Sequence, residues 1–194
     1  MTKRFKRRDL ILEKANLLFT ERGFSDTSLA NIADAVGIKR ESLYYYYPGK
    51  YDLLYDIIEP QIINVMKNFD QITAQEEDIR KIIERGIYNH LEQFNSSYLH
   101  MALAIRKNSR KDVQQKFTRL YDMFKCYEDS WIKLIHEACG RGDIKSKTPP
   151  KMLVYSILGL CNSLSSWYRP DGDLSLDHVA RYFTDIVLNG IDGA

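Results

Sequence analysis

The chain has 194 residues, of which 44% are hydrophobic, and its formal net charge is +2 at pH 7. This length and composition are sufficient for one large domain or two small domains with a buried core. The charge is uneven, because residues 1–50 carry ten Lys/Arg against six acidic residues, a net +4, and the remainder carries −2. We therefore expect the N-terminal quarter to be the part that meets a polyanion.

The sequence argues against several other classes of protein. It has no run of about 18 apolar residues that would predict a transmembrane helix, and its basic, amphipathic start does not fit a signal peptide. Cys126, Cys139 and Cys161 are widely spaced and odd in number, which indicates reduced thiols in a cytoplasmic protein. His136 and Cys139 would supply only two metal ligands. We expect no metal, no cofactor and no enzymatic activity, since no catalytic or phosphate-binding motif occurs.

The first fifty residues are predicted to form three helices. The first covers residues 9–22 and ends at Gly23, with apolar residues at i, i+4, i+7 and i+8: Ile11, Ala15, Leu18 and Phe19. Thr27 or Ser28 begins a short second helix that ends near residues 36–37. A third helix covers residues 38–47. Two short helices that follow a longer one and are joined by a glycine-containing turn form a helix-turn-helix unit.

The rest of the chain is predicted to form longer helices: residues 51–69, 77–94, 97–107, 110–139, 151–167 and 175–188. Pro60 lies inside the first of these and is expected to kink or break it. The polar residues 145–150 form a linker, and residues 169–172 form a turn. Alternating strand patterns are absent. The predicted fold class is therefore all-α, with a DNA-binding domain over residues 1–50 and a larger helical domain over residues 51–194.

Four consecutive tyrosines, residues 44–47, end the third predicted helix. Successive helical residues are rotated by about 100°, so these four cannot share one environment. Tyr47 is in phase with Leu43 and is expected to pack inward, whereas Tyr44, Tyr45 and Tyr46 point away from that core. Exposed phenols beside cationic and hydroxyl side chains suit a DNA major groove. The alternative is a hydrophobic interface with another helix.

The segment TSLANIADAVGIKRESLYYYYPGKYDLL, residues 27–54, resembles the N-terminal DNA-binding domain of the TetR family of bacterial transcriptional regulators. Its matching positions are Thr27, Ile32, Ala33, Gly37, Leu43, Tyr44, Lys50 and Leu53. The resemblance implies that the N-terminus of the second helix contacts a phosphate of the DNA. Residues at the start of the third helix would read bases or phosphates, and Tyr44 and Lys50 would touch the DNA backbone. The DNA-binding residues implied in this way are Thr27, Ser28, Lys39, Arg40, Ser42, Tyr44, Tyr45, Tyr46 and Lys50.

Two features of this region leave alternatives open. Glu41 replaces a residue that is usually small in the family; its carboxylate either accepts from a cytosine amino group or pairs with Arg40 or Arg22, and we favour the pairing. The segment TKRFKRR, residues 2–8, either lies along the DNA as a basic arm or is a solvated tail.

Residues 165–191 resemble the C-terminal part of TetR-type regulators of fatty-acid and sterol catabolism. In those proteins a Trp-Tyr-x-Pro-x-Gly turn joins the last two helices, which form a four-helix interface between two subunits. The resemblance implies a homodimer interface with these residues: Val154, Ile157, Leu158, Cys161, Val179, Phe183, Ile186 and Val187. Apolar stripes of this kind also occur in the core of a single chain.

Large side chains between residues 77 and 139 are candidates for an effector pocket. They are Tyr88, Phe94, Tyr98, Phe117, Tyr121, Phe124, Tyr127 and Trp131, and they are enough either to line a cavity or to fill one. Nearby cations could bind the phosphates of an acyl-CoA or be solvated: Arg106, Lys107, Arg110 and Lys111.

The resemblance implies a ligand-responsive transcriptional regulator, most simply a repressor that binds double-stranded DNA at a palindromic operator as a homodimer. Its effector would be a small hydrophobic or acyl-CoA-like molecule that favours a different spacing of the two DNA-reading units. The alternative is a helical small-molecule-binding or interaction protein that retains the fold without specific operator binding.

Overall fold

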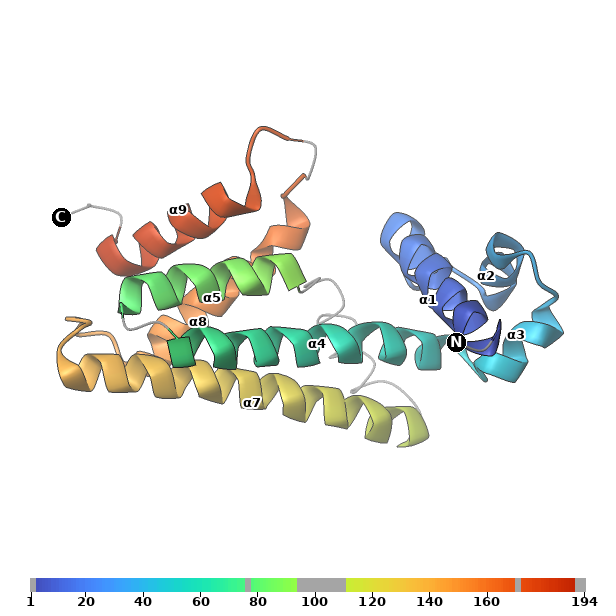
Figure 1. Cartoon of the computed structure of the whole chain (residues 1–194), viewed down its shortest axis with the longest axis horizontal. Helices are drawn as coiled ribbons and strands as arrows, with labels where there is room; N and C mark the ends of the chain where they lie inside the picture. Colours follow the sequence, from blue (N-terminus) through green and yellow to red (C-terminus); the bar gives the residue numbers. More distant parts are fainter. Residues whose placement is uncertain (1–2, 76–77, 94–110, 170–171, 191–194) are drawn as a thin grey trace. The chain divides into compact units, whose positions relative to one another are not determined.

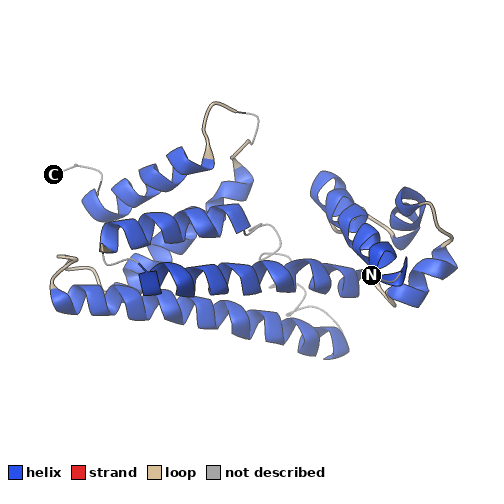
Figure 2. Ribbon diagram, viewed as in Figure 1, coloured by secondary structure: helices blue, strands red, loops and turns tan. Residues whose placement is uncertain are grey.

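The computed structural model describes residues 3–75, 78–93, 111–169 and 172–190, and across these residues it contains helices and loops but no strand (Figure 2). The all-α prediction is therefore confirmed. The chain divides into two compact units, Met1–Pro60 and Gln61–Ala194. Each unit has its own core, and we describe each separately.

The first unit contains α1 (Lys3–Arg22), α2 (Leu29–Val36), α3 (Arg40–Tyr46) and the first residues of α4 (Lys50–Gln75) (Figure 1). Its core is formed by residues with little or no exposed surface: Ile11, Ala15, Phe19, Ile32, Leu43, Tyr47, Leu53 and Leu54. Gly37 ends α2 in the left-handed region, with φ 70°, and its N–H donates to Ala33 O and Asp34 O. This turn sends the chain directly into α3, as the glycine position predicted.

Two helices of this unit differ in length from the prediction. The first begins at Lys3, six residues before the predicted start, so the basic segment is the first part of α1. The third ends at Tyr46, because Tyr47 is extended, with φ −139° and ψ 113°. A proline ring disfavours the helical conformation of the residue before it, and Pro48 follows Tyr47.

Pro60 was expected to kink or break its helix, and a break is wrong, since α4 continues through Pro60 to Gln75. Proline removes one helical hydrogen bond and introduces a steric clash, at a cost of about 3 kcal/mol. Buried side chains on both sides hold the helix in place, including Ile57, Ile58, Ile62 and Val65. Burial of each contributes about 1.5–3 kcal/mol, which together exceeds the cost of the proline.

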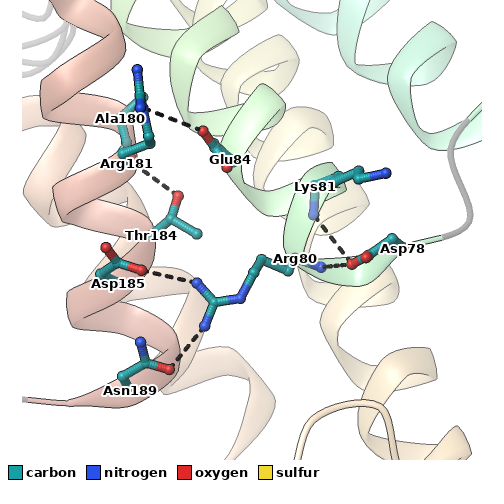
Figure 3. Close-up of polar contacts among 9 residues, drawn as sticks. All are labelled: Asp78, Arg80, Lys81, Glu84, Ala180, Arg181, Thr184, Asp185 and Asn189. Carbon is teal, nitrogen blue, oxygen red and sulfur yellow. Dashed lines mark hydrogen bonds and ion pairs between the residues drawn. The ribbon is translucent and has the colours of Figure 1, made fainter. Parts of the chain in front are cut away.

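The second unit contains the remainder of α4 with α5 (Ile79–Gln93), α7 (Lys111–Arg141), α8 (Pro150–Ser163), the 3-10 turn η1 (Leu164–Ser166) and α9 (Leu176–Asn189). The predicted helix over residues 97–107 lies outside the described residues. In this unit α5 packs on α9 and α8, and α7 packs on α8. Arg80 of α5 donates to Asp185 and Asn189 of α9, each at 2.9 Å (Figure 3).

An aromatic cluster occupies the centre of the second unit. The rings of Phe69 and Trp131 have centroids 4.5 Å apart, and Tyr127 meets Phe69 edge to face at 5.5 Å. Gly86 on α5 provides the space for Trp131, because a Cβ at this position would lie 2.7 Å from the indole ring. The cluster therefore fixes where α4, α5 and α7 meet.

No described helix combines the length and the apolar character that crossing a membrane requires. Within the same residues no three His, Cys, Asp or Glu side chains gather as a metal site. The three cysteines are all free.

Candidate nucleic-acid interface and ligand cleft

The outer face of α3 presents polar and aromatic side chains to solvent. Tyr44 is 43% exposed and Tyr45 is 67% exposed, while Tyr46 is half-buried. The rings of Tyr45 and Tyr46 meet edge to face, with centroids 5.3 Å apart. Exposed side chains beside them are Lys39, Arg40 and Ser42. Tyr47 is buried, as its phase in the helix predicted.

Arg40 and Tyr44 form a pair one helical turn apart on this face. Arg40 Nη2 donates to Tyr44 Oη at 2.9 Å, and the guanidinium carbon lies 5.5 Å from the centroid of the ring. This contact orients both groups before any ligand binds and leaves the other guanidinium N–H groups for a base or phosphate. Glu41, in the first turn of α3, forms no ion pair within the described part of the chain. The favoured pairing of Glu41 with an arginine is therefore not observed among these residues.

The start of α2 has a well-formed cap. Ser28 Oγ accepts from Asn31 N at 3.1 Å, and Ser28 N donates to Asn31 Oδ1 at 2.9 Å. Ser28 is exposed, and the first turn of α2 contains no acidic residue. The helix dipole and free backbone N–H groups at such an end favour a phosphate.

Thr27 does not belong to this surface, which corrects its predicted role. The residue is 0% exposed, and its hydroxyl donates to Gly23 O at 2.8 Å and Leu18 O at 3.2 Å. These bonds tie the end of α1 to the start of α2. The Thr27 side chain therefore stabilises the turn, and the exposed group at this helix end is Ser28.

Lys50 was also predicted to touch a phosphate, and the structure places its ammonium elsewhere. Its Nζ donates to three backbone carbonyl oxygens of the turn before α2, at 2.5, 3.3 and 2.9 Å: Phe24, Ser25 and Thr27. It also lies 4.3 Å from the centroid of the Phe24 ring. Burial lowers the pKa of Lys50. Because all three N–H donors have partners, Lys50 acts here as a link between α4 and that turn.

A polar network that the sequence did not indicate joins α1, α3 and α4. Arg8 Nε donates to Tyr47 Oη at 2.9 Å, and Arg8 Nη2 pairs with Asp56 Oδ2 at 2.5 Å. The hydrogen bond to Tyr47 and the Asp56 carboxylate both raise the pKa of Arg8. Burial raises the pKa of Tyr47 to about 12, so its hydroxyl stays protonated. One residue of the basic segment thus fixes the end of α3.

A cleft of about 590 Å³ lies between α5, α7 and α8 in the second unit. Its lining residues are His90, Tyr121, Phe124, Lys125, Tyr127, Glu128, Lys151, Tyr155, Leu158, Gly159 and Asn162. Three of the predicted pocket residues are therefore brought together here: Tyr121, Phe124 and Tyr127. A separate cleft of about 580 Å³ has charged residues in its lining: Asp70, Lys133, Glu137 and Arg141. The first cleft, with its aromatic lining, is the better ligand site.

The other predicted pocket residues lie elsewhere. Phe117 and Trp131 are buried in the core of the second unit. Tyr88 lines a smaller cleft, of about 310 Å³, beside α9. Phe94 and Tyr98 lie outside the described residues. Sequence reasoning missed His90, which lines the ligand cleft and whose Nε2 lies 3.2 Å from Asn162 Oδ1.

The predicted dimer residues divide into two groups. Five lie in the core of their own unit, with at most 8% exposure: Val154, Ile157, Cys161, Val179 and Phe183. Leu158 and Val187 are half-buried, and Ile186 is 47% exposed. Ile186 shares the outer face of α9 with Tyr182, which is 54% exposed and stacks on His178. The large exposed hydrophobic side chains of α9 are therefore Tyr182 and Ile186, one helical turn apart and next to His178. We call Tyr182 and Ile186 the α9 stripe.

Comparison with known families agrees with this arrangement. The family model "Bacterial regulatory proteins, tetR family" matches residues 11–57, and the model "Tetracyclin repressor-like, C-terminal domain" matches residues 75–191. The helix-turn-helix surface and the helical unit that follows it therefore define a DNA-binding transcriptional regulator, and this chain belongs to the TetR family. The predicted family is confirmed.

Individual relatives extend over nearly the whole chain. The HTH-type transcriptional repressor KstR2 of Rhodococcus jostii is 27% identical over 187 residues, which cover 95% of this chain and 91% of that protein. KstR2 of Mycobacterium tuberculosis has a similar structure, with a TM-score of 0.83 at 21% identity, covering 95% and 94% of the two chains. AibR, solved with isovaleryl coenzyme A and operator DNA, has a TM-score of 0.76 at 19% identity, covering 94% and 98%. These two structures show that the fold is shared.

Proposed function

We propose that this protein is a transcriptional repressor that binds a palindromic operator as a homodimer and responds to a small effector. The observation that carries the proposal is the exposed Arg40–Tyr44 pair on α3, beside Ser42 and Tyr45. A surface that combines an oriented guanidinium, hydroxyl groups and aromatic faces suits base edges and phosphates in a major groove. Its place of action would be the chromosomal DNA in the cytoplasm.

In the proposed DNA complex α3 enters the major groove and α2 approaches the backbone. Arg40 and Ser42 read base edges, whereas Lys39 and the N-terminus of α2 at Ser28 bind phosphates. Tyr44 and Tyr45 contact the backbone and the groove wall. Thr27 and Lys50 stabilise the turn before α2, and through it the position of this surface.

The proposed dimer interface uses the outer face of α9. Tyr182 and Ile186 provide exposed apolar surface there, and the half-buried Val187 lies beside the core on the same helix. Leu158 on α8, also predicted for the interface, lines the ligand cleft instead. The five buried residues of the predicted interface support this face from inside. A two-fold dimer would place two α3 helices against two half-sites.

The proposed effector site is the cleft between α5, α7 and α8. Its volume of about 590 Å³ is within the range of small-molecule sites, about 300–1,000 Å³. Lys125 and Lys151 are exposed at the cleft and suit the anionic part of an amphipathic ligand such as an acyl-CoA. AibR, which shares the fold, was solved with isovaleryl coenzyme A. An effector changes DNA affinity only if it binds one conformation of the dimer more tightly.

One observation favours a second candidate function. Glu41 is exposed on α3, and a carboxylate on that surface repels phosphates. A helical small-molecule-binding protein that has the fold without specific operator binding would tolerate this charge.

Selection of bound sites from random DNA duplexes distinguishes the two functions. We expect recovery of an inverted repeat whose half-sites are about one helical turn, ~10 base pairs, apart. The control is the Arg40→Ala variant, which we expect to lose base preference at one position in each half-site. No enrichment at low ionic strength would support the second candidate, and a single unpaired half-site would contradict the dimer.

A further inference from the structure

Glu41 lies at the centre of the outer face of α3. Leu43, which is 0% exposed, marks the buried side of this helix, and Tyr45, which is 67% exposed, marks the opposite side. Successive helical residues are rotated by about 100°, so Glu41 stands about 160° from Leu43 and about 40° from Tyr45, one turn earlier. Glu41 is itself exposed. A DNA groove that receives the outer face of α3 therefore encloses the Glu41 carboxylate.

Among the residues that the structure describes, no cation neutralises the Glu41 carboxylate. The ion pairs of this part of the chain involve other carboxylates. The neighbouring cation, Arg40, donates from Nη2 to Tyr44 Oη at 2.9 Å. An unpaired carboxylate in the groove lowers affinity for any duplex, because it is repelled by the phosphates. It recovers that loss only where a base offers it a hydrogen-bond donor.

The major groove offers few donors to a carboxylate, which can only accept hydrogen bonds. Guanine presents the acceptors N7 and O6 there, and thymine presents the acceptor O4 and a methyl group, so both repel or exclude the charge. Adenine has a donor at N6, but the acceptor N7 lies beside it. Cytosine presents the N4 amino group without a neighbouring acceptor on the same base. Cytosine is therefore the base that suits Glu41.

We infer that Glu41 is a specificity-determining residue, which accepts a hydrogen bond from N4 of one cytosine in each half-site and is repelled by DNA that lacks this cytosine. The inference rests on the proposed DNA-binding function and deepens it, since it names a base that α3 reads. The charge that lowers affinity for DNA in general thus becomes the means by which the protein rejects other sequences.

The test titrates wild type and Glu41→Ala, by fluorescence anisotropy, with duplexes that carry each of the four base pairs at every half-site position of the selected operator. At one position wild type is expected to bind cytosine at least about tenfold more tightly than the other bases. In Glu41→Ala this preference falls to about one. Glu21→Ala removes the same charge from an exposed position on α1 and retains the preference. No such preference in wild type, its survival in Glu41→Ala or its loss in Glu21→Ala overturns the inference.

A second comparison tests the atom that Glu41 contacts. N4-methylcytosine pairs with guanine but presents a methyl group in the major groove where cytosine presents an N4–H. At the selected position it is expected to lower the affinity of wild type about tenfold and to leave that of Glu41→Ala unchanged. Equal affinity of wild type for the two bases would count against the N4 contact.

Failure of this inference and failure of the proposed function give different results. If wild type selects an operator but shows no cytosine preference that depends on Glu41, the inference is wrong and the proposed function stands. If neither wild type nor Glu41→Ala binds any duplex, the proposed function is wrong and the inference falls with it. If Glu41→Ala selects an operator and wild type selects none, Glu41 only repels DNA, which also overturns the inference.

Discussion

The Lys50 ammonium donates to three carbonyl oxygens of the turn before α2, so its effect on DNA binding should be indirect. We predict that Lys50→Ala lowers DNA affinity because the turn that positions Ser28 loosens. The dependence of log affinity on log salt concentration should remain that of wild type, because no phosphate contact is lost. Fluorescence anisotropy titrations at several salt concentrations measure both quantities.

Lys39→Ala is the matched control for that prediction. Lys39 is exposed at the N-cap of α3 and has no side-chain capping bond, so its ammonium is available to a phosphate. Its loss should flatten the salt slope by about 0.9, the value for one phosphate on duplex DNA. If Lys50→Ala flattens the slope by the same amount, the Lys50 ammonium leaves its carbonyls and binds DNA directly.

Residue roles were predicted well where they depend on helical phase and poorly where they depend on distant partners. The inward position of Tyr47 follows from its spacing to Leu43 on one short helix. By contrast, Lys50 meets carbonyls 23–26 residues earlier, and Arg8 meets Tyr47 and Asp56 at separations of 39 and 48 residues. No periodic pattern encodes such contacts, because they exist only after α1, α3 and α4 have packed.

At the scale of the helix, we predict opposite effects on stability when Gly86 and Gly159 are each replaced by alanine. A Cβ at Gly86 would lie 2.7 Å from Trp131, so Gly86→Ala must displace the indole and should destabilise the protein by about 1–3 kcal/mol. A Cβ at Gly159 meets nothing within 4 Å, so Gly159→Ala should stabilise α8 by up to about 1 kcal/mol. Chemical denaturation of both variants measures the difference. Equal stability of the two would contradict the close approach of Trp131 to Gly86.

The apolar periodicity of the sequence predicted where the helices lie, but it predicted their ends less accurately. The stop at Gly37 was predictable, because glycine adopts φ 70° without strain. The continuity of α4 through Pro60 was not, since it depends on buried side chains on both sides of the proline. The apolar stripes of α8 and α9 were also visible in the sequence. Whether a stripe faces its own core or a second subunit depends on packing, and most of the predicted interface residues face the core.

For the whole molecule, buried His90 predicts a loss of stability in mild acid. Burial lowers its pKa to about 4 in the folded protein, whereas an unfolded histidine has a pKa of about 6.5. The free energy of unfolding is therefore unaffected by His90 protonation above pH 6.5. It decreases as the pH falls toward 4, by up to about 3 kcal/mol, because the unfolded state binds the proton first. Urea unfolding from pH 7.5 to 5 should show a steeper loss for wild type than for His90→Gln. The exposed control, His136→Gln, should follow wild type. Parallel profiles for wild type and His90→Gln would contradict the buried, neutral imidazole.

The proposed dimer predicts different effects for two exposed isoleucines of the second unit. Ile186 on α9 and Ile63 on α4 are 47% and 46% exposed. Ile186→Asp places a charge on the proposed interface and should convert the dimer to monomers, with a fall in operator affinity of more than tenfold, whereas Ile63→Asp should change neither. Analytical ultracentrifugation gives the molecular mass of each variant. A dimer that persists in Ile186→Asp would contradict the use of the α9 stripe.

The most direct test of the account is the base preference of Arg40→Ala. Wild type and variant are titrated with the selected operator and with duplexes that carry each single base-pair substitution in a half-site. If the outer face of α3 reads DNA, wild type should lose about 1–3 kcal/mol at the base pair that Arg40 contacts, and the variant should lose that discrimination while the other positions keep theirs. An equal loss of affinity for every duplex, or no difference between the two proteins, would contradict the central claim.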